Sequence, residues 1–199
     1  MNHSSLISTC LLLFSLFTSL PGFSQDVGVR GGLNVTNTGG DSGNLGWKPD
    51  FHAGVFLADD LTSGLGYFVT LAYSRQGAQY DRSIVNDWKI NNNYINLSAL
   101  LRYQLSEEWK VLAGPRVGML VNGTIDFPGF SEGSTTESLS AFNLSAALEV
   151  QYKILKKLFL YAGYAHGLTS NVANDNSNPG RFPDRVFQLG VAVNILSGN

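Results

Sequence analysis

Residues 95–104 read INLSALLRYQ, a run in which apolar and polar side chains alternate almost one by one. In an extended chain, Leu97 and Leu101 lie on one face, while Ser98 and Arg102 lie on the other. A period of two residues predicts a β-strand with one apolar and one polar face.

The same alternation recurs along the rest of the chain, and no helical period of useful length interrupts it. The further predicted strands are 27–35, 51–57, 65–74, 109–119, 142–152, 158–164 and 187–195. The predicted short turns are 59–64, 106–108 and 153–157. The predicted long polar loops are 37–49, 75–93, 122–140 and 168–184. Short turns at one end and long loops at the other are typical of an up-and-down transmembrane β-barrel.

Composition narrows the class of protein. Of the 199 residues, 44% are hydrophobic and 14% are charged, well below the roughly 25% charged residues of an ordinary soluble domain. After residue 25, no apolar run approaches the roughly 20 residues that a membrane helix needs, so helical membrane proteins are excluded. The net charge of -2 and the scattered Lys and Arg residues predict no nucleic-acid partner.

The content of the second strand face indicates which face meets lipid. That face is mostly Gly, Ala, Ser, Thr, Asn and Gln, whereas the exterior of a soluble barrel carries many more charges. Small polar side chains fit the interior of an eight-stranded barrel, which side chains fill. Aromatic residues also gather at both strand ends, as membrane girdles do; they are Tyr67, Tyr103, Trp109 and Tyr152 at the short-turn end, and Phe51, Tyr73, Phe142, Tyr164 and Phe187 at the long-loop end.

These patterns predict an all-β fold, an eight-stranded antiparallel up-and-down transmembrane β-barrel with a filled polar lumen. We expect the protein in the cell outer membrane, surrounded by lipid and inserted by the outer-membrane assembly machinery. The alternative is a soluble periplasmic or secreted lipocalin-like barrel that binds a small apolar ligand.

The first residues predict a secretory signal peptide. Residues 6–23 read LISTCLLLFSLFTSLPGF, and small residues at Gly22 and Ser24 fit cleavage after Ser24. The predicted organisation is therefore a signal peptide at 1–24 and one outer membrane β-barrel domain at 25–199. Cys10 is the single cysteine of the sequence, so the mature chain is expected to have no disulfide and no thiol chemistry.

The charged residues on the predicted lumen face include Arg30, Arg102, Arg116 and Glu149. Charges in a closed lumen are costly unless they are paired and hydrogen-bonded. We therefore predict a polar network that links Glu149 to one or more of the arginines, with a structural role in fixing the barrel.

Residues for catalysis or metal binding do not gather in the sequence. His52 and His166 each lack a second histidine or a carboxylate at ligand spacing. We expect no catalytic, cofactor-binding or metal site, no cofactor and no enzyme activity.

Six blocks resemble a known family. They are VGVRGGLN (27–34), FHAGVF (51–56), LAYSRQGAQY (71–80), YINLSALLRYQL (94–105), VLAGPRVGML (111–120) and FQLGVAV (187–193). In order and spacing they resemble the PorT-like outer membrane β-barrel domain of Bacteroidetes, which is related in architecture to barrels of the outer-membrane protein A type. The resemblance implies a barrel and, through the founding type, a link to secretion of cell-surface proteins; it transfers no functional residues. The chain departs from such barrels in ending NILSGN, without a terminal aromatic.

The expected function is that of a non-enzymatic outer-membrane barrel with long extracellular loops, in envelope structure, adhesion or secretion-related assembly. A monomer is expected, with an envelope protein as a partner that the loops would contact.

Overall fold

The computed structural model describes residues 25–38, 45–80, 89–126, 133–134, 140–169 and 183–197. The strands in this part of the chain are β1 (Asp26–Thr38), β2 (Leu45–Gly46), β3 (Lys48–Thr62), β4 (Leu65–Tyr80), β5 (Lys89–Gln104), β6 (Trp109–Asp126), β7 (Gly133–Ser134), β8 (Phe142–Leu155), β9 (Leu158–Gly167) and β10 (Asp184–Leu196). None of these residues belongs to a helix that is long and apolar enough to cross a membrane. The predicted signal peptide, 1–24, lies outside the described residues.

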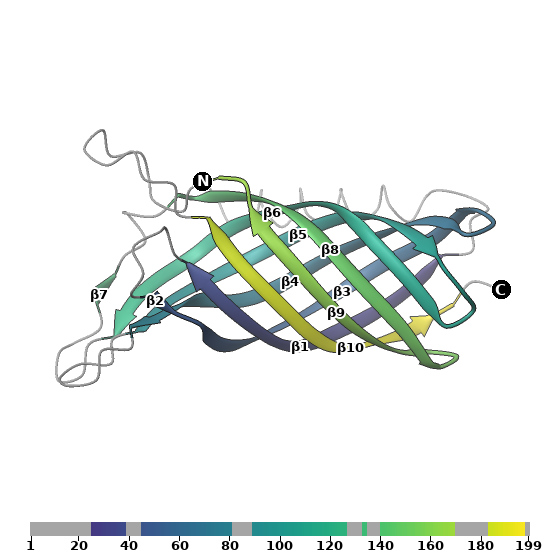
Figure 1. Ribbon diagram of the computed structural model, residues 1–199, viewed down its shortest axis with the longest axis horizontal. Helices are drawn as coiled ribbons and strands as arrows, with labels where there is room; N and C mark the ends of the chain where they lie inside the picture. The colour runs from purple at the N-terminus through teal and green to yellow at the C-terminus, as the bar shows by residue number, and fades with distance from the viewer. Residues whose placement is uncertain are drawn as a thin grey trace, which may run out of the picture.

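Eight of the strands close into an antiparallel barrel, in the order β1, β3, β4, β5, β6, β8, β9 and β10. Strand β10 returns to β1, and the two pair from Val27↔Leu196 to Thr38↔Asp184. The two-residue strands β2 and β7 pair with the ends of β4 and β6, respectively, at the long-loop end, on the left of Figure 1. The predicted up-and-down barrel of eight strands is therefore confirmed, and its last strand pairs with β1 from Asp184 to Leu196, with one register shift near its end.

The strands are longer than predicted at the long-loop end. The sequence predicts a loop at 75–93, yet β4 continues to Tyr80, β5 begins at Lys89, and the two remain paired to Gln79↔Lys89. Strand β6 likewise runs on to Asp126, into the predicted loop 122–140. Beyond the lipid the outer face need not be apolar, so backbone pairing continues where the sequence alternation fades.

The opposite end of the barrel is made of tight turns. Strands β3 and β4 are joined through Ser63 and Gly64, and Gly64 has a φ of +92°, a conformation that favours glycine. Strands β8 and β9 are joined at Lys156 and Lys157, within the predicted turn. Because β1 begins and β10 ends at this same end, it corresponds to the periplasmic side of such barrels, and the long-loop end is extracellular.

The two faces of the wall carry opposite kinds of side chain. Outward-facing apolar residues are exposed, and several are more than half exposed, including Leu33 at 63%, Leu97 at 51% and Leu189 at 62%. Inward-facing Asn34 and Gln151 are 0% and 4% exposed. This pattern places apolar side chains toward lipid and polar ones in the lumen, the reverse of a soluble lipocalin-like barrel.

Candidate functional site in the barrel lumen

A buried ion pair crosses the middle of the lumen. The Arg30 guanidinium of β1 donates two hydrogen bonds to the Glu149 carboxylate of β8, with N–O distances of 3.2 and 2.7 Å. The Gln151 amide donates a further hydrogen bond to Glu149 Oε1 at 2.9 Å. The Arg30 and Glu149 side chains are 4% and 3% exposed. A forked arginine–carboxylate pair of this kind fixes both side chains and ties β1 to β8 across the barrel.

Aromatic rings enclose the guanidinium. Arg30 Cζ lies 3.8 Å from the ring centroid of Tyr161 and 5.6 Å from that of Phe68. The Tyr161 hydroxyl is hydrogen-bonded to Nε2 of His52, and Nδ1 of His52 has no partner. Cation–π contact and ion pairing therefore act on the same arginine.

Glycine on the lumen face makes room for Tyr161. A Cβ on Gly190 would lie 2.5 Å from the Tyr161 hydroxyl and 2.4 Å from the carbonyl oxygen of Gly31. Both distances are below any normal contact, so the ring reaches Arg30 because position 190 carries no side chain.

A second chain of hydrogen bonds occupies the extracellular half of the lumen. Arg116 donates to Ser98 Oγ at 3.1 Å and to Gln188 Oε1 at 2.7 Å. Gln188 in turn donates to Asn34 Oδ1 at 2.9 Å, and Asn34 donates to Ser74 Oγ at 2.9 Å. These side chains come from β6, β5, β10, β1 and β4. The series of hydrogen bonds therefore links five strands of the barrel wall.

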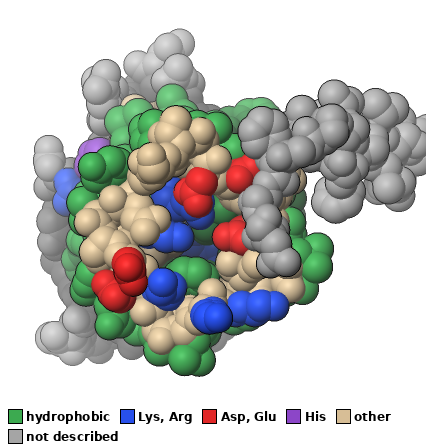
Figure 2. All heavy atoms as spheres, turned by 90° about the vertical axis from the view of Figure 1, so that its right-hand side faces the viewer, with side chains coloured by type: hydrophobic (Ala, Val, Ile, Leu, Met, Phe, Trp, Pro, Cys, Tyr) green, Lys and Arg blue, Asp and Glu red, His purple; other side chains and the backbone are tan. Residues whose placement is uncertain are grey.

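At the periplasmic mouth the charges pair differently. Arg102 donates to Asp60 Oδ1, at the end of β3, over 2.7 Å, and Lys110 Nζ lies 5.4 Å from the ring centroid of Phe159. Seen from this end, Lys, Arg, Asp and Glu side chains gather over the mouth, while hydrophobic side chains surround it (Figure 2).

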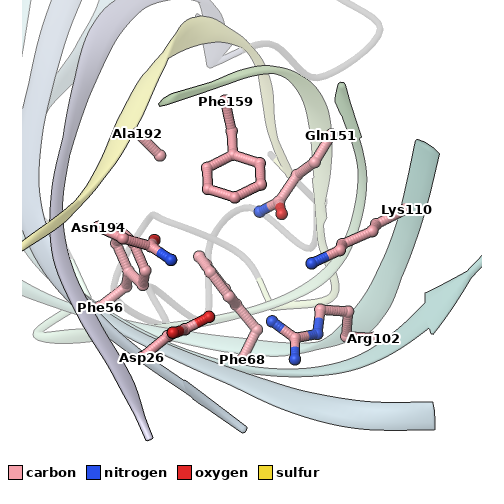
Figure 3. A pocket seen from close by; sticks show the side chains of 9 residues that line it. All are labelled: Asp26, Phe56, Phe68, Arg102, Lys110, Gln151, Phe159, Ala192 and Asn194. Carbon is pink, nitrogen blue, oxygen red and sulfur yellow. The ribbon is translucent and has the colours of Figure 1, made fainter. Parts of the chain in front are cut away.

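Beneath the mouth the lumen also contains an apolar layer. Phe56 and Phe68 stack with ring centroids 4.9 Å apart, and Leu112 and Phe159 are buried beside them in the same cluster. Figure 3 shows the three phenylalanines pointing into the space that Arg102 and Lys110 also line. The polar filling predicted for the lumen thus has an aromatic layer added to it at the periplasmic end.

Two small cavities lie between these layers among the described residues. The one in Figure 3 and another beside Tyr94 and Arg116 each have a volume of about 10 Å³, which is room for about one water molecule. The ion pairs and hydrogen bonds across the lumen link strands of the barrel wall, and the side chains that form them fill the lumen. It offers no space for a substrate in these two cavities.

The four predicted lumen residues all lie inside the barrel, but in three separate groups. Arg30 pairs with Glu149, Arg116 is hydrogen-bonded to Gln188, and Arg102 pairs with Asp60 near the end of β3. Sequence reasoning missed Tyr161, Gln188 and Asp60. Their inward or rim positions follow from alternation, but their partners depend on the register between strands far apart in sequence.

The two histidines do not come together. His52 lies in the lumen, whereas His166 lies on the outer wall and accepts or donates a hydrogen bond at Nδ1 with the Tyr164 hydroxyl. Within the described ranges, no three His, Cys, Asp or Glu side chains gather as a metal site.

A closed barrel of eight antiparallel strands, with lipid-type residues outside and a side-chain-filled interior, defines a class: the small transmembrane β-barrels of the outer membrane. The family model for the outer membrane protein β-barrel domain matches residues 9–194, and the chain belongs to this family. The protein is accordingly an outer-membrane protein.

Solved structures agree on the fold. Neisserial surface protein A matches with a TM-score of 0.57 and 17% identity, over 85% of this chain and 97% of the other. Ail, the attachment invasion locus protein of Yersinia pestis, matches with a TM-score of 0.53 and 14% identity, over 86% of this chain and 99% of the other. A search of curated proteins found no match. At these identities the likeness concerns the fold.

Proposed function

We propose that this protein is a closed, non-enzymatic barrel that anchors extracellular strands and loops in the outer membrane, where they act in envelope structure or adhesion. The observation that carries the proposal is the filled lumen, in which Arg30, Glu149 and Tyr161 cross the centre of the barrel. Because these side chains block the lumen, the structure favours a role in binding at the ends of the barrel over transport of a solute through its centre.

The extracellular end supports the same proposal. Strands β4, β5 and β6 project past the Phe51–Tyr73 aromatic pair, and β2 and β7 add pairing to them. Paired strands hold a surface rigidly, which favours recognition of a macromolecular partner. Ail, which shares the fold, is named as an attachment protein.

Conductance in planar lipid bilayers tests the closed lumen. We expect no steps in current for the unaltered protein at physiological salt. A variant with Arg30, Glu149 and Tyr161 all changed to Ala serves as the positive control, because it removes the central layer. Channel-like steps from folded, unaltered protein would overturn the proposal.

A cell-binding assay tests adhesion. It compares how well cells with and without the protein bind to a surface coated with extracellular matrix.

Within the family, we propose that the chain belongs to the PorT-like group. The ordered blocks VGVRGGLN (27–34), YINLSALLRYQL (94–105) and FQLGVAV (187–193) support this narrower kinship. It predicts a secretion-related role, and deletion of the gene followed by measurement of cell-surface protein export tests it. Unchanged export would contradict this part of the proposal.

A further inference from the structure

An aromatic and cationic patch lies on the outer wall of the barrel, near its extracellular end. It comprises Trp47, Tyr164, His166, Arg185 and Phe187, and we call it the outer-wall patch. Strands β10 and β9 are neighbours here, with Arg185 opposite His166 and Phe187 opposite Tyr164. The patch therefore has two levels, an aromatic level and, one step further from the membrane, a cationic level.

The aromatic level is a continuous row. The Phe187 ring lies 5.4 Å from that of Trp47 and 4.7 Å from that of Tyr164, centroid to centroid. Phe187 is 49% exposed and Trp47 is 41% exposed. Such rings offer broad apolar faces at the boundary between lipid and water, where aromatic girdles lie.

The cationic level stands directly above. Arg185 is exposed between the buried residues Asp184 and Val186. None of the ion pairs among the described side chains includes Arg185. Arg185 precedes Phe187 by two residues in the sequence and lies nearer the extracellular end of β10. The separation is about 7 Å along the strand and roughly 5 Å along the membrane normal at a tilt near 40°. That height corresponds to the headgroups of the outer leaflet.

His166 completes the level. Its Nδ1 is hydrogen-bonded to the Tyr164 hydroxyl at 3.0 Å. When Tyr164 donates that bond, Nε2 of the neutral ring carries the proton and is a second donor, on the residue that pairs with Arg185 across the two strands. A guanidinium binds phosphate through two parallel hydrogen bonds.

From this geometry we propose that the outer-wall patch binds a phosphorylated glycolipid of the outer leaflet. The phosphate lies on Arg185 and His166, and the sugar ring lies against the row Trp47, Phe187 and Tyr164. Charge complementarity and continuity with the lipid-facing wall select a membrane lipid as the occupant. The site is distinct from the lumen and does not depend on the proposed function.

Native mass spectrometry of the protein in phosphatidylcholine nanodiscs that contain bisphosphorylated lipid A tests this inference. The unaltered protein is expected to retain the lipid, and Arg185→Ala is expected to weaken retention about tenfold, as the loss of a charged hydrogen-bonding group does. Lys157→Ala, an exposed cation in the opposite, periplasmic turn, is the matched control and is expected to change nothing.

Two further arms separate phosphate recognition from general lipid adhesion. Lipid A stripped of its phosphates is expected to be retained no better by the unaltered protein than by Arg185→Ala. Phe187→Leu keeps an apolar side chain and is expected to weaken retention of both lipids, since the aromatic row is broken. Heat-shifted gel mobility confirms folding of each variant. Equal retention of phosphorylated lipid by the unaltered, Arg185→Ala and Lys157→Ala proteins would overturn the inference, as would equal retention of the two lipids by the unaltered protein.

Discussion

At the scale of single residues, the lumen is organised around Arg30. It is held by the carboxylate of Glu149 and by the ring of Tyr161, while Gly190 leaves the space that the ring occupies. Alternation in the sequence places Arg30, Arg102, Arg116 and Glu149 inside the barrel, but the choice of partner depends on distances across the lumen. Arg102 illustrates this, because its partner Asp60 lies at the turn end of another strand.

The first prediction concerns the buried pair. Glu149→Gln leaves the Arg30 charge buried without a countercharge, so the free energy of unfolding is expected to fall by about 3 kcal/mol. Guanidinium unfolding in lipid vesicles, followed by heat-shifted gel mobility, measures it. Glu108→Gln, in an exposed turn, is the control. The double variant Arg30→Met, Glu149→Met removes both charges and is expected to recover part of the loss; an unchanged stability in Glu149→Gln would show that the pair does not hold the barrel.

The second prediction concerns the space beside Tyr161. Gly190→Ala is expected to cost about 1–3 kcal/mol of unfolding free energy, because the new methyl group collides with the Tyr161 hydroxyl and a backbone carbonyl. The companion Gly190→Ala, Tyr161→Ala removes the collision with the Tyr161 side chain, whose hydroxyl and Cζ would lie 2.5 and 2.7 Å from the new methyl group, and is expected to be less destabilised relative to Tyr161→Ala. Equal costs in the two backgrounds would show that Tyr161 does not contact position 190.

At the scale of strands, the sequence predicts the membrane-spanning segments well and their ends poorly. Residues 142–152 alternate throughout, and the structure has β8 over Phe142–Leu155. Residues 75–80 lose the alternation, so the sequence predicts a loop there, although β4 continues through them. The alternation comes from lipid on one side, so it stops at the edge of the lipid while backbone pairing continues.

The third prediction follows from the lipid-facing side of β8. Leu148 is 53% exposed and lies near the middle of the strand, so Leu148→Arg is expected to cost about 2–4 kcal/mol of unfolding free energy in a bilayer. Leu105 is 60% exposed in a periplasmic turn, and Leu105→Arg is expected to cost less than about 1 kcal/mol. Urea titration of the two variants in vesicles compares them; equal costs would contradict the assignment of β8 to the membrane interior.

At the scale of the whole molecule, the low charge content of the sequence has a physical explanation. Outward side chains contact lipid and inward side chains fill a narrow lumen. Charged side chains are costly in both places, so few of them occur on the barrel wall. The sequence predicts that polar side chains fill the lumen, but it does not predict how the lumen side chains are arranged in layers along the barrel axis. The stacked Phe56 and Phe68 near the periplasmic mouth and the Arg116 chain nearer the loops emerge when the barrel closes.

The central claim is that this barrel has its apolar face outside and its small polar face inside. Electron paramagnetic resonance of spin labels tests it most directly, with Cys10 replaced by Ser and single cysteines placed in turn at residues 144–148 of β8 in vesicles. We predict that collision with dissolved oxygen, which concentrates in lipid, is high at 144, 146 and 148 and low at 145 and 147. The opposite phase, or a strong collision rate with a water-soluble nickel reagent at 144, 146 and 148, would contradict the account.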